Sequence, residues 1–220
     1  MASGLTRMTE RIKSCGGRLK RPQNQTRFNP LERRMLKRLL LIALLCTPVA
    51  AWAFFKPVRI VAPELAGVSC IDDSLCTDDV SRYEQASKLY DEALNFVGSS
   101  IGSIENKPRV IFCSSDDCFQ SFGLGKRSAA TIGTFGIVIS PRAWKPYYVR
   151  HEMIHHLQNE KLGVFEVWND PQWFIEGMAY SLSEDPRPTL SEPFEHYRSQ
   201  FDDWYRQTGK DRLWEEARRL

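Results

Sequence analysis

Three features are scarce in this sequence: histidine, long hydrophobic runs, and an excess of positive charge outside the N-terminal segment. Only one uncharged run is long enough to cross a bilayer, which excludes a membrane protein with several spans. Residues 39–220 carry 19 Lys and Arg against 25 Asp and Glu. The folded part is therefore acidic, and a nucleic-acid partner is not expected. Hydrophobic residues make up 42% of the chain and charged residues 26%, a balance that is typical of a globular protein.

The positive charge is concentrated in residues 1–38, and an uncharged run follows at 39–55. Basic residues stay on the cytoplasmic side of a membrane-spanning segment, so we expect a cytoplasmic basic tail at 1–38. The run at 39–55 fits either a transmembrane signal anchor, which would stay in the membrane, or a cleaved signal peptide. In both cases residues 56–220 form an exported domain, which is periplasmic or extracellular, and secreted if cleavage occurs. Met35 begins a segment with the proportions of a signal peptide, so an over-extended start at 1–34 is a further hypothesis.

The exported part carries four cysteines, arranged as two pairs that are close in the sequence. An even number of paired cysteines suits an oxidising compartment. Of the three pairings that four cysteines allow, we expect Cys70–Cys76 and Cys113–Cys118, because each closes a short loop. A zinc site is a poor alternative, since neither pair has the two-residue spacing of a zinc knuckle. Free buried thiols are the other alternative.

Hydrophobic periodicity predicts several elements in the exported part. Apolar residues recur at helical spacing between Tyr83 and Ile101, which predicts an amphipathic helix. Apolar runs at Arg109–Cys113 and Thr131–Ser140 predict two strands, the second interrupted by glycines. Residues 191–220 contain an aromatic stripe and predict one or two amphipathic helices that close the core.

Three of the four histidines lie in the segment HEMIHH, which contains the pattern HExxH. On a helix, His151 and His155 lie one turn apart on the same face, so their imidazoles can bind one zinc ion. Glu152 is placed beside the first of them, where it can take a proton from a metal-bound water without being a ligand. The alternative is a solvated helix whose histidines are incidental.

A catalytic zinc ion needs a third protein ligand, with the fourth position left open. Glu176 is the charged residue within the apolar stretch WFIEGMAY. A carboxylate in such surroundings is costly unless it is paired or binds a metal, although an exposed helix glutamate is the alternative. The predicted ligands of one Zn²⁺ per chain are therefore His151, His155 and Glu176, with Glu152 as the general base. Gly177 is expected to let the HExxH helix and this helix approach closely.

HEMIHH followed by WFIEGMAY resembles the gluzincin metallopeptidases, in which an HExxH helix is joined by a glutamate on the next helix. The WFxEGxA context is similar to that of the M1-like (peptidase MA-like) branch, and the resemblance covers about residues 148–183. It implies an α+β fold, a zincin-like minimal metallopeptidase domain whose small mixed sheet packs on the HExxH helix and the following glutamate-bearing helix. It also implies that residues 131–140 are an edge strand beside the cleft, to which an extended peptide could pair.

The activity that the resemblance implies is zinc-dependent hydrolysis of peptide bonds, with a peptide or protein as substrate. The GxMEN segment, with which M1 aminopeptidases hold a free substrate amine, is missing from the sequence, so aminopeptidase activity is not implied. Two alternatives remain: a catalytically inactive zinc-containing binding module of the cell envelope, and a zinc hydrolase of a non-peptide substrate. Four side chains are candidates for stabilising the transition state or supporting a ligand, namely Tyr148, Tyr180, His196 and Tyr197.

Overall fold

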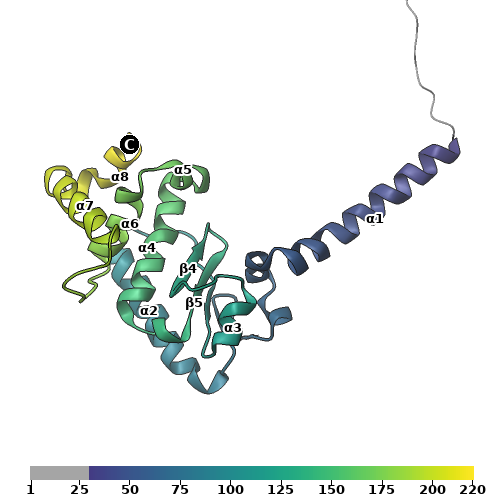
Figure 1. Cartoon of the computed structure of the whole chain (residues 1–220), viewed down its shortest axis with the longest axis horizontal. Coiled ribbons are helices and arrows are strands. Elements are labelled where there is room, and N and C mark those ends of the chain that lie inside the picture. The colour runs from purple at the N-terminus through teal and green to yellow at the C-terminus, as the bar shows by residue number, and fades with distance from the viewer. Residues whose placement is uncertain (1–29) are drawn as a thin grey trace, which may run out of the picture. The chain divides into compact units, whose positions relative to one another are not determined.

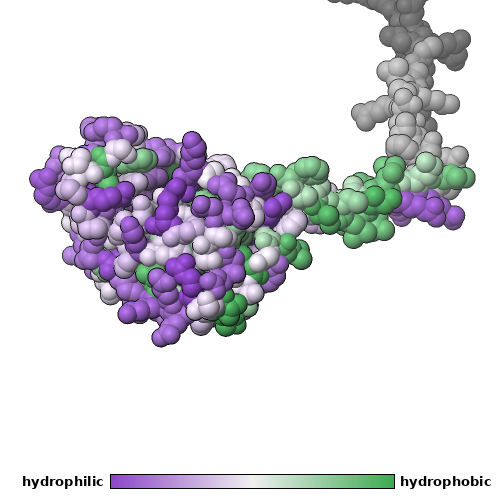
Figure 2. Space-filling model, turned by 60° about the horizontal axis from the view of Figure 1, so that its bottom comes forward, coloured by the Kyte–Doolittle hydropathy of each residue, from purple (hydrophilic) through white to green (hydrophobic). Residues whose placement is uncertain are grey.

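The computed structural model describes residues 30–220, and most of the expected basic tail lies outside this range. The first element is a 25-residue helix, α1 (Pro30–Phe54) (Figure 1). Its segment Arg33–Phe54 is long and apolar enough to cross a membrane, and Figure 2 shows the hydrophobic side chains along it. A signal sequence near an N-terminus has the same features, so both interpretations of the leader stand. The chain divides into two units within α1, between Leu44 and Leu45.

Helices and short strands follow α1, which confirms the expected α+β class (Figure 1). The strands are β1 (Ser69–Cys70), β2 (Leu75–Thr77), β3 (Val110–Phe112), β4 (Ala129–Ile132) and β5 (Gly136–Ile139). The helices are α2 (Tyr83–Ser100), α3 (Asp116–Ser121), α4 (Pro146–Leu162), α5 (Val164–Asn169), α6 (Gln172–Leu182), α7 (Phe194–Thr208) and α8 (Leu213–Ala217). The amphipathic helix predicted from Tyr83 is α2, and the helices predicted near the C-terminus are α7 and α8.

The five strands form one small mixed sheet in the order β1-β2-β3-β5-β4. The three central strands are parallel, and each edge strand is antiparallel to its neighbour. The single strand predicted at 131–140 is wrong, because this segment is a hairpin made from the end of β4 and all of β5. Gly133 has a left-handed φ of 51°, and the N–H of Phe135 donates to the carbonyl oxygen of Ile132 at 3.0 Å. The glycine thus reverses the chain, and of the two strands of this hairpin only β4 lies at an edge of the sheet.

Each central strand sends alternate side chains to opposite faces of the sheet, so two cores form. On one face, Val110 and Phe112 pack with buried residues of α2 and α4. On the other face, Ile111 packs with Phe119 and Phe122, which come from α3 and the residue after it. Figure 1 shows α2 and α4 on one side of the sheet and α3 on the other. The first core fixes α4, the helix that carries the HExxH pattern, against the sheet.

Both predicted disulfide bonds are present. Cys70–Cys76 joins directly opposed residues of β1 and β2. Cys113–Cys118 joins the residue after β3 to the first turn of α3. The two bonds fix the edge of the sheet and its connection to α3, and they agree with folding in an oxidising compartment.

Helix α6 lies against α7 at Gly177, whose missing side chain makes the contact possible. A Cβ atom at this position would lie 2.3 Å from the carbonyl oxygen of Tyr197 and 2.8 Å from Cβ of Phe201. The close neighbour that Gly177 admits is therefore α7, not the HExxH helix as the sequence suggested. This contact fixes the position of α6, and with it the position of the adjacent Glu176.

Candidate metal centre

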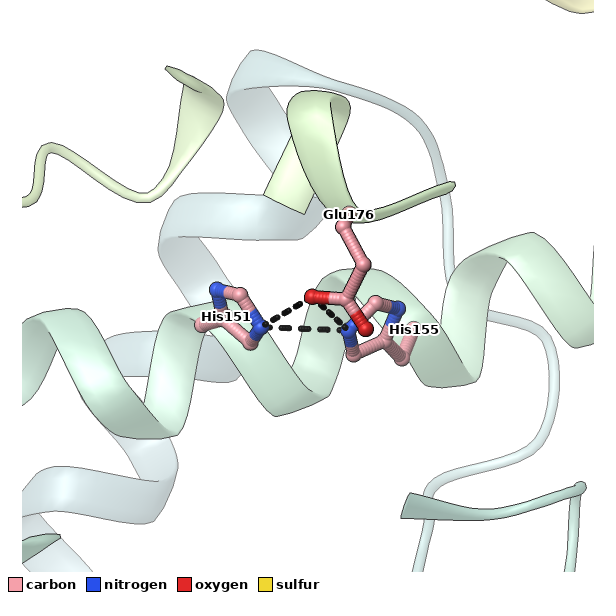
Figure 3. A group of neighbouring side chains, drawn as sticks. All are labelled: His151, His155 and Glu176. Carbon is pink, nitrogen blue, oxygen red and sulfur yellow. Dashed lines mark hydrogen bonds and ion pairs between the residues drawn. The ribbon is translucent and has the colours of Figure 1, made fainter. Parts of the chain in front are cut away.

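Helices α4 and α6 bring His151, His155 and Glu176 together, as Figure 3 shows. The Nε2 atoms of the two histidines lie 3.1 Å apart. Oε2 of Glu176 lies 3.6 Å from Nε2 of His151 and 3.8 Å from Nε2 of His155. The pairing of an HExxH helix with a glutamate from a later helix, which the sequence predicted, is therefore present as a group of converging atoms.

The three atoms fit the requirements of a divalent metal ion. Tetrahedral zinc with nitrogen and oxygen ligands at about 2.0–2.1 Å holds any two of them about 3.3 Å apart. The observed separations of 3.1, 3.6 and 3.8 Å lie close to this value, so small side-chain shifts suffice to bind an ion. Two imidazoles and one carboxylate are also a donor set that zinc commonly uses. The geometry shows a group that could hold a metal ion, without identifying the metal.

The charge of Glu176 affects the protonation of its neighbours. Burial alone would lower the pKa of His155, but the hydrogen bond and charge of Glu176, followed by the charge of Glu152, outweigh burial and raise that pKa to about 9. Burial alone would raise the pKa of Glu176, but His151 and His155 hold it well below its usual range. The carboxylate is therefore ionised at neutral pH, and its field favours a cation at the histidine Nε2 atoms.

Gln158, which the sequence analysis missed, holds His155 in position. Its side-chain oxygen lies 2.8 Å from Nδ1 of His155, and it is fully buried. A proton on Nδ1 leaves the Nε2 lone pair free, which is the form of histidine that binds a metal. Because Gln158 follows His155 by three residues, helical spacing alone could have identified this contact.

Glu152, the predicted general base, is buried and points to the edge strand. The hydroxyl of Thr131, on β4, lies 2.8 Å from Oε2 of Glu152 and 2.8 Å from its backbone carbonyl oxygen. The hydroxyl has one proton, which it donates to one of these two acceptors or shares between them, so it links the carboxylate to the helix turn that carries it. No local pattern marks Thr131, because the contact joins residues that are 21 positions apart.

His151, His155 and Glu176 are called the metal group below. Of the four accessory candidates, Tyr180 is the one whose ring packs on a member of this group. Its ring centroid lies 4.4 Å from that of His151 in an edge-on arrangement. Burial, followed by the charge of Glu176, raises the pKa of Tyr180 to about 12, so its hydroxyl keeps its proton and can donate a hydrogen bond. Tyr148 lies on α4 one turn before His151, on the same face of the helix.

The structure places the other two accessory candidates, His196 and Tyr197, on α7. His196 is exposed, and its ring lies 6.4 Å from that of Tyr197. The contact of Tyr197 with α6 is made by its backbone at Gly177. Within residues 30–220, neither side chain forms a hydrogen bond, ion pair or ring contact with the three metal-binding candidates. Helix α7 supports the site through its packing on α6.

Comparisons with known proteins add no assignment: no family model matches the chain, and no curated protein or solved structure does. The interpretation of this site rests on its residues and their geometry.

Proposed function

We propose that this chain is an exported zinc-dependent metallopeptidase of gluzincin type. The observation that carries the proposal is the convergence of His151, His155 and Glu176 on one point, with all three ligand atoms within 4.8 Å of one another. Glu152 directly follows His151 on the same helix, which is the motif position of the general base that we propose. Without a metal ion, an ion pair between protonated His155 and the Glu176 carboxylate is the structural alternative.

The residues of the site divide the chemistry between them. A zinc ion bound there would polarise a peptide carbonyl and lower the pKa of a bound water to about 7. Glu152 accepts the proton of the attacking water and passes it to the leaving amine. Thr131 holds the Glu152 carboxylate during this transfer. Tyr180, whose ring packs on His151 and whose hydroxyl stays protonated, is the donor that we propose for the developing oxyanion.

Export is supported by two independent features. The apolar segment Arg33–Phe54 can lead the chain to a membrane, and the two disulfide bonds are stable outside a reducing cytoplasm. The domain at 56–220 would then act in the periplasm or outside the cell. It would be attached to the membrane if the helix is retained and free if it is cleaved.

The test uses the full chain, produced in a compartment that permits disulfide formation and purified in detergent. Wild type and Glu152→Gln are loaded with zinc and incubated with a peptide library, and cleavage is followed by mass spectrometry. We expect one zinc per chain in both proteins and cleavage by wild type alone, abolished by a chelator and restored by zinc. Zinc binding without any cleavage would favour the alternative, a non-catalytic zinc module. Equal cleavage by both proteins would refute the role of Glu152.

A further inference from the structure

Arg187, in the loop that joins α6 to α7, lies close to the group formed by His151, His155 and Glu176. The guanidinium carbon of Arg187 lies 5.5 Å from the ring centroids of Tyr147 and Tyr148 and 5.7 Å from that of Tyr180. Tyr180 in turn packs on His151, with ring centroids 4.4 Å apart. The positive charge is therefore separated from a metal-binding candidate by one aromatic ring, at a distance where cation–π attraction is effective.

One side of this guanidinium is held and the other is open. Nε of Arg187 donates to both carboxylate oxygens of Asp185, at 2.8 and 3.0 Å, and Nη2 donates to one of them. The Asp185 side chain is only 1% exposed, whereas that of Arg187 is 38% exposed. Among the described residues, none accepts a hydrogen bond from Nη1 of Arg187. The buried carboxylate thus fixes the plane of the guanidinium and leaves an N–H group free to bind a ligand.

The loop itself is fixed by α7, so the arginine is preorganised. Arg198 donates from Nη1 to the carbonyl oxygen of Arg187 and from Nη2 to that of Pro188, each at 3.2 Å. Glu195 accepts the backbone N–H of Leu190 at 2.8 Å. A guanidinium held by its neighbours loses little conformational entropy when it binds a ligand, which favours recognition.

The balance of charges around the site permits a negatively charged group to bind there. Glu152, Glu176 and Asp185 carry three negative charges, and a divalent ion at the site would balance two of them. Arg187 balances the third. With such an ion bound, the formal charges of these groups would sum to zero, and an anionic part of a substrate would meet the free N–H donor of Arg187.

We propose that Arg187 binds a carboxylate of the substrate, next to the bond that is cleaved. This inference rests on the proposed function, because it names a substrate feature recognised at the same site. The carboxylate has two sources in a peptide: the C-terminus, or an aspartate or glutamate side chain. Guanidinium groups recognise both with the same hydrogen-bond geometry. The first source would make the protein a carboxypeptidase-like enzyme, and the second an endopeptidase with acidic preference.

The test measures binding rather than turnover, in zinc-loaded Glu152→Gln protein. The probes are N-acetyl-tetraalanine as free acid, its C-terminal amide, and two amidated peptides that differ by Glu or Gln at the third position. Affinities are measured by calorimetry. We expect either the free acid or the Glu peptide to bind at least about tenfold more tightly than its neutral partner, as one charge-assisted hydrogen bond provides. The pair that shows the difference identifies the source of the carboxylate.

Variants separate recognition from folding. Arg187→Met should abolish the difference, and Arg187→Lys should retain part of it. Asp185→Asn keeps the cation and one acceptor oxygen, and it should preserve part of the difference. Asp185→Asn combined with Arg187→Met avoids an unpaired buried carboxylate and should lose the difference completely. Arg206→Met, on the exposed face of α7, is the matched control for loss of a positive charge and should change nothing.

The outcomes are distinct for the two proposals. Equal affinity within both peptide pairs, no binding of any probe, or a difference that survives Arg187→Met would overturn the inference about Arg187. Discrimination that depends on Arg187, in a protein whose wild type cleaves no peptide, would instead refute the proposed peptidase activity and leave a carboxylate-binding zinc site.

Discussion

Gln158 on α4 donates its side-chain N–H to the carbonyl oxygen of Ile175 on α6, at 3.0 Å. Ile175 immediately precedes Glu176, and the oxygen of the same amide accepts from Nδ1 of His155 at 2.8 Å. One buried side chain therefore connects a histidine of the metal group to the helix turn that carries its carboxylate. Any shift of α6 relative to α4 would break this connection, so the amide sets the spacing of the site.

Replacing this amide should weaken metal binding and stability together. Gln158→Met keeps the volume but leaves Nδ1 of His155 without its acceptor and removes the bond that ties α4 to the Ile175 carbonyl of α6. We expect a loss of about 3 kcal/mol in the free energy of unfolding and of about 10-fold to 100-fold in zinc affinity. Thermal unfolding and titration with a competing zinc chelator measure the two effects.

Two further variants separate the effect on stability from the effect on zinc affinity. Gln158→Glu keeps the acceptor for His155 and loses the donor to Ile175, so it should lower stability more than zinc affinity. Gln172→Met, at the exposed first residue of α6, is the matched control and should change neither. Unchanged zinc affinity in Gln158→Met would show that the amide does not orient His155.

The hydroxyl of Thr131 should matter for catalysis and not for metal binding. Thr131→Val removes the hydrogen bond to Glu152 while keeping the shape of the side chain. A general base that is free to rotate spends less time in the reactive position, so we expect kcat to fall by about 10-fold to 100-fold with zinc affinity unchanged. Steady-state kinetics on a peptide found in the library screen measure the effect. Thr131→Ser keeps the hydroxyl and should restore most of the rate, and an undiminished kcat in Thr131→Val would rule out this role.

Replacing a glycine by alanine should change the free energy of unfolding in opposite directions at two helical positions. At Gly177 a methyl group would collide with the backbone of Tyr197, so Gly177→Ala should lower the free energy of unfolding by about 1–3 kcal/mol. At Gly98, on α2, nothing lies within 4 Å of the added Cβ. Gly98→Ala should therefore stabilise the protein by about 0.5–1 kcal/mol through helix propensity. Thermal unfolding of both variants tests the packing of α6 on α7. Equal changes in stability in Gly177→Ala and Gly98→Ala would contradict this packing.

Lowering the pH should remove the contribution that Asp78 makes to the stability of the fold. Burial raises its pKa, but hydrogen bonds from Ser114 and Ser115 outweigh burial and hold it below the ordinary value of 3.8. The folded protein therefore binds this proton less readily than the unfolded chain does. Asp78 stabilises the fold above pH 3.8, and the contribution disappears as the pH falls through the lower folded value. Because the carboxylate is partly exposed, its size is about 1 kcal/mol or less.

Unfolding of the metal-free protein at several pH values checks this assignment. The stability difference between wild type and Asp78→Asn should be largest near neutral pH and should shrink below pH 3.8. Asp73→Asn is the control, since the Asp73 side chain is exposed and accepts no recorded hydrogen bond within the described part of the chain. A difference that is constant with pH would mean that Asp78 acts through packing alone.

The metal group could be predicted from the sequence because its information is local. His151 and His155 are one helical turn apart, and Glu176 lies in an apolar stretch where an isolated charge is costly. Short-range spacing also sufficed for both disulfide bonds, since each closes a small loop. These features depend on residues near one another in the chain, where helix geometry and loop length leave few alternatives.

Contacts between distant elements could not be predicted in this way. Thr131 meets Glu152 only because β4 is the edge strand next to α4, and this placement depends on the hairpin at Gly133, which was expected to be a single strand. Arg187 lies in a proline-bearing loop without a motif, and it reaches the site only because α7 holds that loop. Such placements follow from packing between elements, on which periodicity in one segment carries no information.

The most direct measurement of the central claim is a crystal structure of the zinc-loaded protein, with anomalous diffraction recorded at the zinc edge. The account predicts one anomalous peak per chain, bonded to Nε2 of His151, Nε2 of His155 and Oε2 of Glu176. A chain that takes up no zinc, or a peak elsewhere with the Glu176 carboxylate turned away from the two histidines, would contradict it.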